Sequence, residues 1–422
     1  MKMRNVVIAL LMAASVACSK EEAKQKAQNV TAKVKKSVDN ALDVAVPIGN
    51  REDPAAREKE RFDESWRGVF QNVKMSGQPQ GPAAPKVNLT FAPNGKESFK
   101  GLDANAINTA PIVVPLKGDV AGPSVLKTQV YLDRVHYSVG ALDGRWGRNS
   151  AISLWWYQRA HGINTAEPGA VDEQTFRALA AQAGGVPALV QHTLTEEDVA
   201  GPFVQLPDDV YEKEKLECLC YETKQEKLAE LFHTTQDFLK QLNPDADFPS
   251  LTAGQTLWVP NVREPLSADQ PDIARIVVSI RGNTLNAFDA NGALLFHAPT
   301  TLGSKYDPSP NETTKVVKVV FDPHFHYQPT LFHEVPDSDP EAELNPGPNS
   351  PVGVVWVALS KPHFGIHGTS DPESIGYASS HGCVRLANWD AREVGHRVTP
   401  GVEVAFVDTR DAEPSSETAE KQ

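Results

Sequence analysis

The sequence predicts a multidomain protein, in which a small three-helix bundle and a small α+β module precede a mostly-β domain. Two observations predict this class. Apolar residues recur at helical spacing within residues 120–190 and again within residues 208–263, whereas residues 271–408 form short apolar runs bounded by turn residues. The length of 422 residues also has room for two to four modest domains rather than one.

The composition is that of globular domains joined by long connecting segments. Hydrophobic residues make up 40% of the chain and charged residues 23%, while 32 prolines and 28 glycines favour linkers. The net charge of −13 argues against nucleic acid or an anionic bilayer surface as the main partner, because both attract basic patches.

Residues 1–18 have the pattern of a secretory signal. Lys2 and Arg4 precede an apolar run at residues 6–14, and small residues then lead to Cys18. The run is shorter than the roughly 20 residues that a membrane-spanning helix needs. The end of the segment resembles a bacterial lipobox, which implies that Cys18 is lipidated and becomes the mature N-terminus. That would anchor the protein in the periplasm or cell envelope, on the outer membrane if present; plain secretion with an incidental Cys18 is the alternative.

Two segments are predicted to be disordered. Residues 19–115 show no sustained periodicity, and breaker residues concentrate at 77–85, so the segment is interpreted as a tether. A flexible coil of about 95 residues has a root-mean-square length of roughly 50–60 Å. Residues 409–422 form an acidic tail.

The predicted bundle at residues 120–190 begins with a helix near Ser124. Asn149 and Asp172 are expected to cap the next two helices, and Trp155 and Trp156 lie on one helical face. Three motifs resemble the peptidoglycan-binding domain of bacterial wall hydrolases: DGRWG at 143–147, WYQR at 156–159 and GAVD at 169–172. The resemblance implies recognition beside the first of these motifs, and the alternative is that the tryptophans simply form core.

The α+β module at residues 208–263 is expected to contain a strand at 218–221, a helix at 225–232, a helix capped by Thr235 and a strand at 256–259. Three of its motifs resemble a LysM glycan-binding module: EKLAELF at 226–232, LNP at 242–244 and GQTLWVP at 254–260. Lys and Gln occupy 224–225, where that family usually has Gly-Asp. Glycan binding and a purely structural role therefore both stay open.

Cys218 and Cys220 lie in the expected strand, where their Cα atoms would be about 6.6 Å apart. This is near the outer limit for a disulfide, so a pair of thiols is predicted, although an oxidising compartment leaves a bridge open.

The region 271–408 reads mainly as strands. Residues 276–280 and 284–288 are expected to form strands, and residues 289–292 a hairpin turn. The almost wholly apolar run 352–359 predicts a central strand buried on both faces, and 402–407 a further strand.

Two segments of this region carry the chemistry: FGIHGT at 364–369 and SSHGCVRL at 379–386. A cysteine thiol is a weak nucleophile until it is ionised, and a nearby imidazole can take its proton. Flanking glycines let backbone amides face a developing oxyanion. Cys383 and His367 are therefore predicted to be nucleophile and base; an inert buried cysteine is the alternative. Asn388 is expected to cap the helix that follows.

Both segments closely resemble the active-site signature of the L,D-transpeptidase (YkuD-like) family, as do GPNSPVG at 347–353 and Trp356. The resemblance implies a mostly-β sandwich with Cys383 as nucleophile and His367 as base. The Gly368 carbonyl would orient the imidazole, and the amides of Gly382 and Cys383 would hold the oxyanion. The remaining signature positions are assigned to substrate binding: Ser380, His381, Arg385 and Thr369.

The implied reaction cross-links peptidoglycan tetrapeptide stems without a metal or other cofactor. Alternatives are an L,D-carboxypeptidase, an enzyme that attaches or detaches lipoproteins, and a non-catalytic peptidoglycan-binding anchor. A zinc enzyme is a further rival because the chain has 12 histidines. Glycine and proline around His363 and His367 make a helical zinc pair unfavourable, and solvated or stacking histidines account better for His324, His326 and His333.

Overall fold

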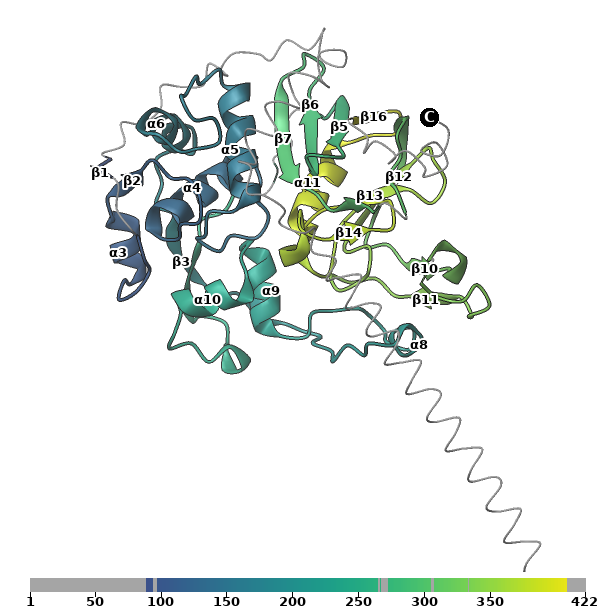
Figure 1. The fold of residues 1–422 in the computed structure, drawn as a ribbon. Helices are drawn as coiled ribbons and strands as arrows, with labels where there is room; N and C mark the ends of the chain where they lie inside the picture. Colours follow the sequence, from purple (N-terminus) through teal and green to yellow (C-terminus); the bar gives the residue numbers. More distant parts are fainter. Residues whose placement is uncertain are drawn as a thin grey trace, which may run out of the picture.

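The computed structural model describes residues 89–93, 97–264, 266, 272–304, 307–332 and 334–407. Most helices gather on one side and the main sheet on the other, with helix α11 (Asn388–Arg397) between them (Figure 1). The signal segment with Cys18 and the acidic tail lie outside the described residues. None of the described helices combines the length and apolar character that a membrane crossing needs.

The folded part begins earlier than the predicted end of the tether at residue 115. Strand β1 (Phe91–Pro93) pairs in parallel with β2 (Ile112–Val114), and helix α3 (Ala104–Thr109) separates them in sequence. Ile112 is buried in the same core as the helices that follow. The disorder predicted for residues 97–115 is therefore wrong, because apolar residues too sparse to form a periodic pattern still pack against neighbouring helices.

The next region contains helices α4 (Pro123–Arg134), α5 (Arg148–Ala160) and α6 (Glu173–Gln182). Asp172 caps α6 by accepting a hydrogen bond from the Thr175 amide at 2.7 Å. Asn149 does not cap α5, because the helix already begins at Arg148. Trp155 and Trp156 are both buried, and their rings meet edge to face at 5.0 Å.

The module that follows pairs strand β3 (Leu189–Thr193) antiparallel with β4 (Thr256–Pro260). Its helices lie between these strands in sequence: α7 (Glu196–Val199), α8 (Val210–Lys213), α9 (Lys224–Leu231), α10 (Gln236–Leu242) and the 3-10 turn η1 (Phe248–Ser250). In the described structure residues 218–221 form no strand. The strand predicted there is wrong, and the predicted start at residue 208 leaves out β3.

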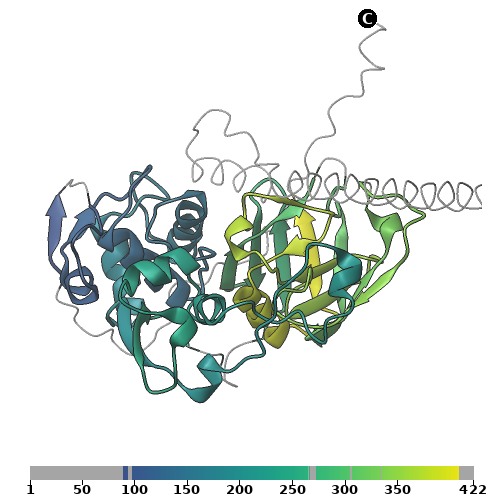
Figure 2. The same ribbon diagram turned by 90° about the horizontal axis from the view of Figure 1, so that it is seen from below.

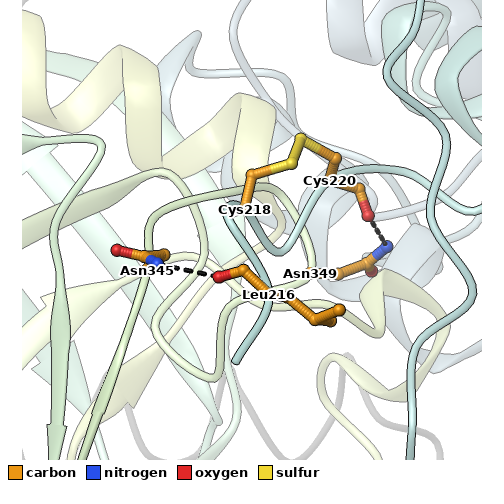
Figure 3. The surroundings of a disulfide bond; sticks show 5 residues. All are labelled: Leu216, Cys218, Cys220, Asn345 and Asn349. Carbon is orange, nitrogen blue, oxygen red and sulfur yellow. Dashed lines mark hydrogen bonds between the residues drawn. A yellow bond between two sulfur atoms is a disulfide. The ribbon is translucent and has the colours of Figure 1, made fainter. Parts of the chain in front are cut away.

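Cys218 and Cys220 form a disulfide (Figure 3). Their Cα atoms are 5.2 Å apart because the segment is not an extended strand, so the prediction of two thiols is wrong. Two asparagines of the C-terminal region donate hydrogen bonds to backbone carbonyls at and near this disulfide. Asn345 donates to the carbonyl of Leu216 at 2.8 Å, and Asn349 donates to that of Cys220 at 3.1 Å.

An eight-stranded mixed sheet dominates the C-terminal region, which confirms the mostly-β prediction. Its strands in spatial order are β15 (Val384–Arg385), β13 (Gly365–His367), β12 (Val355–Leu359), β9 (Thr313–Phe321), β16 (Glu403–Val407), β5 (Arg275–Ser279), β6 (Thr284–Phe288) and β7 (Leu294–Pro299). The short elements are β8 (Leu302–Gly303) paired with β14 (Ser379–Ser380), β10 (Phe325–Tyr327) paired with β11 (Ala342–Leu344), and the 3-10 turns η2 (Pro329–Leu331) and η3 (Pro372–Ser374).

Strand β12 is shorter and less buried than predicted. Val355, Val357 and Leu359 are buried in the core, whereas Trp356 and Ala358 are only partly buried. Residues 352–354 form a turn. The doubly buried strand predicted for 352–359 is wrong, because Trp356 lies on the other face, where its ring stacks on His367.

A buried charge cluster joins the helical region to α11. The Arg263 guanidinium contacts three carboxylates: Asp133 at 2.6 Å, Asp390 at 2.7 Å and Glu393 at 2.9 Å. Burial opposes ionisation of Asp133, but Arg263 and His233 outweigh it and hold the pKa of that carboxyl well below its usual range. The cluster ties together regions that lie side by side when the molecule is viewed from below (Figure 2).

Candidate active site

Strands β13 and β15 bring the two chemistry-bearing segments together. They pair in parallel, with Ile366 opposite Val384 and His367 opposite Arg385. Ile366 and Val384 are buried in the sheet core. Because successive side chains on a strand point to opposite faces, His367 and Arg385 share the other face, and Cys383 directly precedes β15 in a bend.

The His367 imidazole is buried and held on two sides. Its Nδ1 donates to the Gly368 carbonyl at 2.7 Å, and its ring stacks on Trp356 with 5.4 Å between centroids. A carbonyl oxygen only accepts, so Nδ1 carries the proton and Nε2 keeps its lone pair. Burial, together with the nearby Arg385 charge, lowers the pKa of His367 to about 3, although the bond to Gly368 acts to raise it. The imidazole is therefore neutral at pH 7.

The Cys383 thiol is also neutral at pH 7. Burial raises its pKa to about 11, although the Gly365 amide and the Arg385 charge both act to lower it. The sulfur lies 3.5 Å from the carbonyl oxygen of His363, to which the thiol donates. The resting state therefore has a neutral thiol and a neutral imidazole rather than a thiolate and an imidazolium.

Gly382 adopts a conformation that disfavours any side chain. Its φ is +103°, and a Cβ there would lie 2.7 Å from a ring carbon of Phe364. Ser309 donates to the Gly382 carbonyl at 2.9 Å, and Ser380 donates to the Cys383 carbonyl at 2.7 Å. These bonds hold the turn around the cysteine. Among the described residues, no acceptor is hydrogen-bonded to the backbone amides of Gly382 and Cys383.

His381 is engaged with neighbours. Its Nε2 lies 2.6 Å from a carboxylate oxygen of Glu334, and its ring meets Phe332 edge to face at 4.9 Å. The signature motif had singled out His381, but neither contact partner was expected. Both partners follow η2 in an irregular segment, where no periodic pattern draws attention to them.

Arg385 and Thr369 occupy different settings. The buried Nε of Arg385 has no hydrogen-bond acceptor within the part of the chain that the structure describes. Thr369 is buried, its amide donates to Asn388 Oδ1 at 3.1 Å, and its hydroxyl accepts from the Asp371 amide at 3.1 Å. Arg385 therefore has capacity for a ligand, whereas Thr369 braces the loop after β13.

Histidines outside this pair give little support to a metal centre. His326 lies 3.0 Å from Glu341, and His324 lies 3.8 Å from Glu343, at exposed positions. No cluster of three or more His, Cys, Asp or Glu residues suited to a metal occurs within the described ranges. His333 lies outside them.

A cavity of about 220 Å³ lies beside the 143–147 loop. Thr235 at the start of α10 and Glu373 and Tyr377 after β13 complete its wall. The Tyr377 side chain is 47% exposed, while its hydroxyl is hydrogen-bonded to the Asn149 backbone. Burial and three neighbouring aspartates raise the pKa of Glu373. The cavity thus offers a fixed aromatic ring and carboxylate acceptors.

The C-terminal region matches the model of a known family. The model of the YkuD family, the L,D-transpeptidase catalytic domain, matches residues 273–406. The YkuD protein of Bacillus licheniformis is 31% identical over 181 residues, covering 43% of this chain and 92% of that protein. The YkuD protein of Bacillus subtilis is 30% identical over 192 residues, covering 44% and 98%. The solved structure of an L,D-transpeptidase from Mycobacterium smegmatis is 20% identical, with a TM-score of 0.26, over 37% of this chain and 74% of that one.

Proposed function

Because the chain belongs to the L,D-transpeptidase family, we propose that it cross-links peptidoglycan through a cysteine acyl-enzyme formed on tetrapeptide stems. The observation that carries this proposal is the parallel pairing of β13, which contains His367, with β15, which directly follows Cys383. The lone pair on Nε2 of His367 supports the role of base, since Nδ1 is committed to Gly368.

The first half-reaction forms a thioester. The Cys383 thiol passes its proton to Nε2 of His367 while the sulfur attacks the carbonyl carbon of the L-centred diamino acid. The C–N bond to the terminal D-alanine then breaks, and the imidazolium returns the proton to the leaving amine. Burial keeps the pKa of His367 near 3, so the imidazolium is a strong proton donor.

The second half-reaction transfers the acyl group. The side-chain amine of another stem attacks the thioester, His367 takes a proton from that amine, the C–S bond breaks and the thiol re-forms. The energy of the exchanged amide is conserved, so no nucleotide or metal is required. The amides of Gly382 and Cys383 are assigned to the oxyanion, and the uncommitted Nε of Arg385 to a substrate carboxylate.

Product analysis with purified tetrapeptide muropeptides tests the proposal. The wild-type chain should form cross-linked dimers, and Cys383→Ala or His367→Ala should abolish them. The exposed His324→Ala variant is the matched control and should keep full yield. A chelator should leave activity intact, whereas a thiol alkylator should remove it. Dimers formed by Cys383→Ala would refute cysteine chemistry.

The same assay separates the alternatives. Tripeptide without dimer would indicate an L,D-carboxypeptidase, and transfer to a lipoprotein only would indicate the attaching variant. A non-catalytic anchor would show neither product and would fail to be acylated at Cys383 by a carbapenem, as measured by intact-protein mass spectrometry.

We also propose that the helical region and the LysM-like module bind peptidoglycan. The cavity beside the 143–147 loop supports this for the helical region, since an exposed ring and carboxylates suit a sugar or peptide group. Tyr377→Ala should weaken co-sedimentation of the inactive Cys383→Ala chain with purified peptidoglycan. Phe321→Ala, which removes an exposed aromatic ring on β9, is the control. Equal binding by both variants would refute a role in binding for the cavity beside the 143–147 loop.

An envelope location with a lipid anchor is a further proposal, supported by the signal-like segment and Cys18. Metabolic labelling with a fatty-acid analogue should tag the wild-type protein and not Cys18→Ala. Equal labelling of both would refute lipidation at Cys18.

A further inference from the structure

The side-chain amide of Asn388 uses all of its hydrogen-bonding capacity. Its Oδ1 accepts from the amides of Val354 at 3.2 Å and Thr369 at 3.1 Å. Its Nδ2 donates to Glu230 Oε2 at 2.9 Å and to the Pro348 carbonyl at 3.1 Å. The residue is 0% exposed, so water cannot replace a lost partner. Asn388, predicted as a helix cap, is instead the first residue of α11 and a junction between four segments.

The Oδ1 side of this junction sets the position of the catalytic histidine. Thr369 directly follows Gly368, whose carbonyl accepts from His367 Nδ1 at 2.7 Å. Gly368 and Gly353 both pack so closely on Asn388 that a Cβ on either would lie 2.1 Å from Oδ1. Because Asn388 and Gly368 are in close contact, a shift of the Asn388 side-chain amide should also shift the Gly368 carbonyl that orients the imidazole.

The Nδ2 side depends on a carboxylate from outside the matched residues 273–406. Glu230 lies on α9; besides accepting from Asn388, it accepts from the Tyr221 hydroxyl at 2.8 Å. Burial raises the pKa of Glu230 to about 7, against the lowering effects of Asn388, Tyr221 and Arg392, while Glu226 adds to the increase. These four groups are the polar and charged neighbours that act on this carboxylate.

We propose that Glu230 is a positioning residue for the cysteine–histidine pair, acting through Asn388 on the Gly368 carbonyl. The proposal rests on the proposed function, because it assumes that His367 is the catalytic base. The structure thereby makes a helix of the LysM-like module a working part of the catalytic centre.

The chemistry of the carboxylate gives the proposal a pH signature. Ionised Glu230 accepts from both Tyr221 and Asn388, and a charge-assisted bond is roughly twice as strong as a neutral one. Protonation removes that charge and weakens the hold on Asn388. Burial lowers the pKa of His367 to about 3 and raises that of Cys383 to about 11, so neither group is expected to produce an inflection at neutral pH. The rate of acylation should therefore fall as pH decreases through about 7, the value at which Glu230 titrates.

The test measures single-turnover acylation with release of D-alanine from a tetrapeptide muropeptide, using the full chain between about pH 5 and about pH 9. Glu230→Gln keeps the acceptor for Asn388 and should retain activity within about threefold at pH 8 while losing the inflection near pH 7. Glu230→Ala leaves one of the two buried N–H groups of Asn388 Nδ2 without an acceptor and should slow acylation by about tenfold or more, with little change in KM. Glu173→Gln, an exposed carboxylate on α6, is the matched control.

The outcomes distinguish this inference from the proposed function. If Cys383→Ala abolishes acylation but Glu230→Gln keeps the wild-type pH profile, the positioning role is overturned. If Glu230→Ala merely unfolds the chain, circular dichroism will show it, and the Glu230→Gln profile still decides. If Cys383→Ala remains active, the proposed function itself fails.

Discussion

Alkylation of Cys383 by iodoacetamide is expected to be slow at neutral pH and to accelerate steeply in alkali. Burial raises the pKa of the thiol to about 11, so only about 0.01% is thiolate at pH 7. Free cysteine, with a pKa of about 8.5, is about 3% thiolate. A more basic thiolate is a better nucleophile. With a Brønsted coefficient of about 0.45, the thiolate of Cys383 should react roughly 13-fold faster than that of free cysteine. The net expectation is alkylation about 20-fold slower than that of a free cysteine.

Mass spectrometry of the Cys383 peptide at timed intervals, with N-acetylcysteine measured in parallel, gives the rate constants. Between about pH 7 and about pH 10 the rate should rise about tenfold per pH unit, because the thiolate fraction does. His367→Ala should leave this slope unchanged, since the imidazole is already neutral. A rate that has reached its plateau at about pH 6 would reveal a thiolate–imidazolium pair and refute the neutral resting state.

Three further expectations follow from the same contacts. Arg263→Ala should lower the free energy of unfolding by about 3–5 kcal/mol in denaturant titrations, because three buried carboxylates lose their partner; the exposed Arg177→Ala should cost less than about 1 kcal/mol, and similar losses would contradict the cluster's role. Gly382→Ala should slow acylation more than tenfold through backbone strain of about 1–3 kcal/mol, whereas Gly401→Ala, with similar φ in open space, should not. Trp356→Ala should raise the pKa of His367 in NMR titrations, because burial is what lowers it; an unchanged value would rule out that cause.

Local patterns predicted regular elements well. A strand was predicted at residues 284–288 because turn residues stand on both sides of it, and β6 spans the same residues. The segments with Cys383 and His367 could also be identified from the sequence, because reactive side chains next to glycines are unusual in a core. Strand bounds and short motifs depend on residues that are adjacent in the sequence, so they can be predicted from it.

Features that depend on distant partners were missed. Asn388 was read as a cap because Asn begins many helices, yet its side chain is directed to α9 and to the loop after β13. Glu230 stands in a charge-rich helical segment, and tertiary packing brings its carboxylate to Tyr221 and Asn388. The strand expected at 218–221 failed for the same reason, since β4 pairs with β3 from a segment more than 60 residues earlier in the chain.

The Arg263 cluster has a practical consequence for anyone who wishes to work with a shortened protein. A fragment cut to residues 271–408 would lose Arg263 and Asp133, so Asp390 would lose its guanidinium partner and Glu393 would be left with Arg397. It would also uncover the ring of Trp389, on which His233 now stacks. The boundaries of a family match are therefore poor places to truncate this enzyme, and expression should start before residue 97.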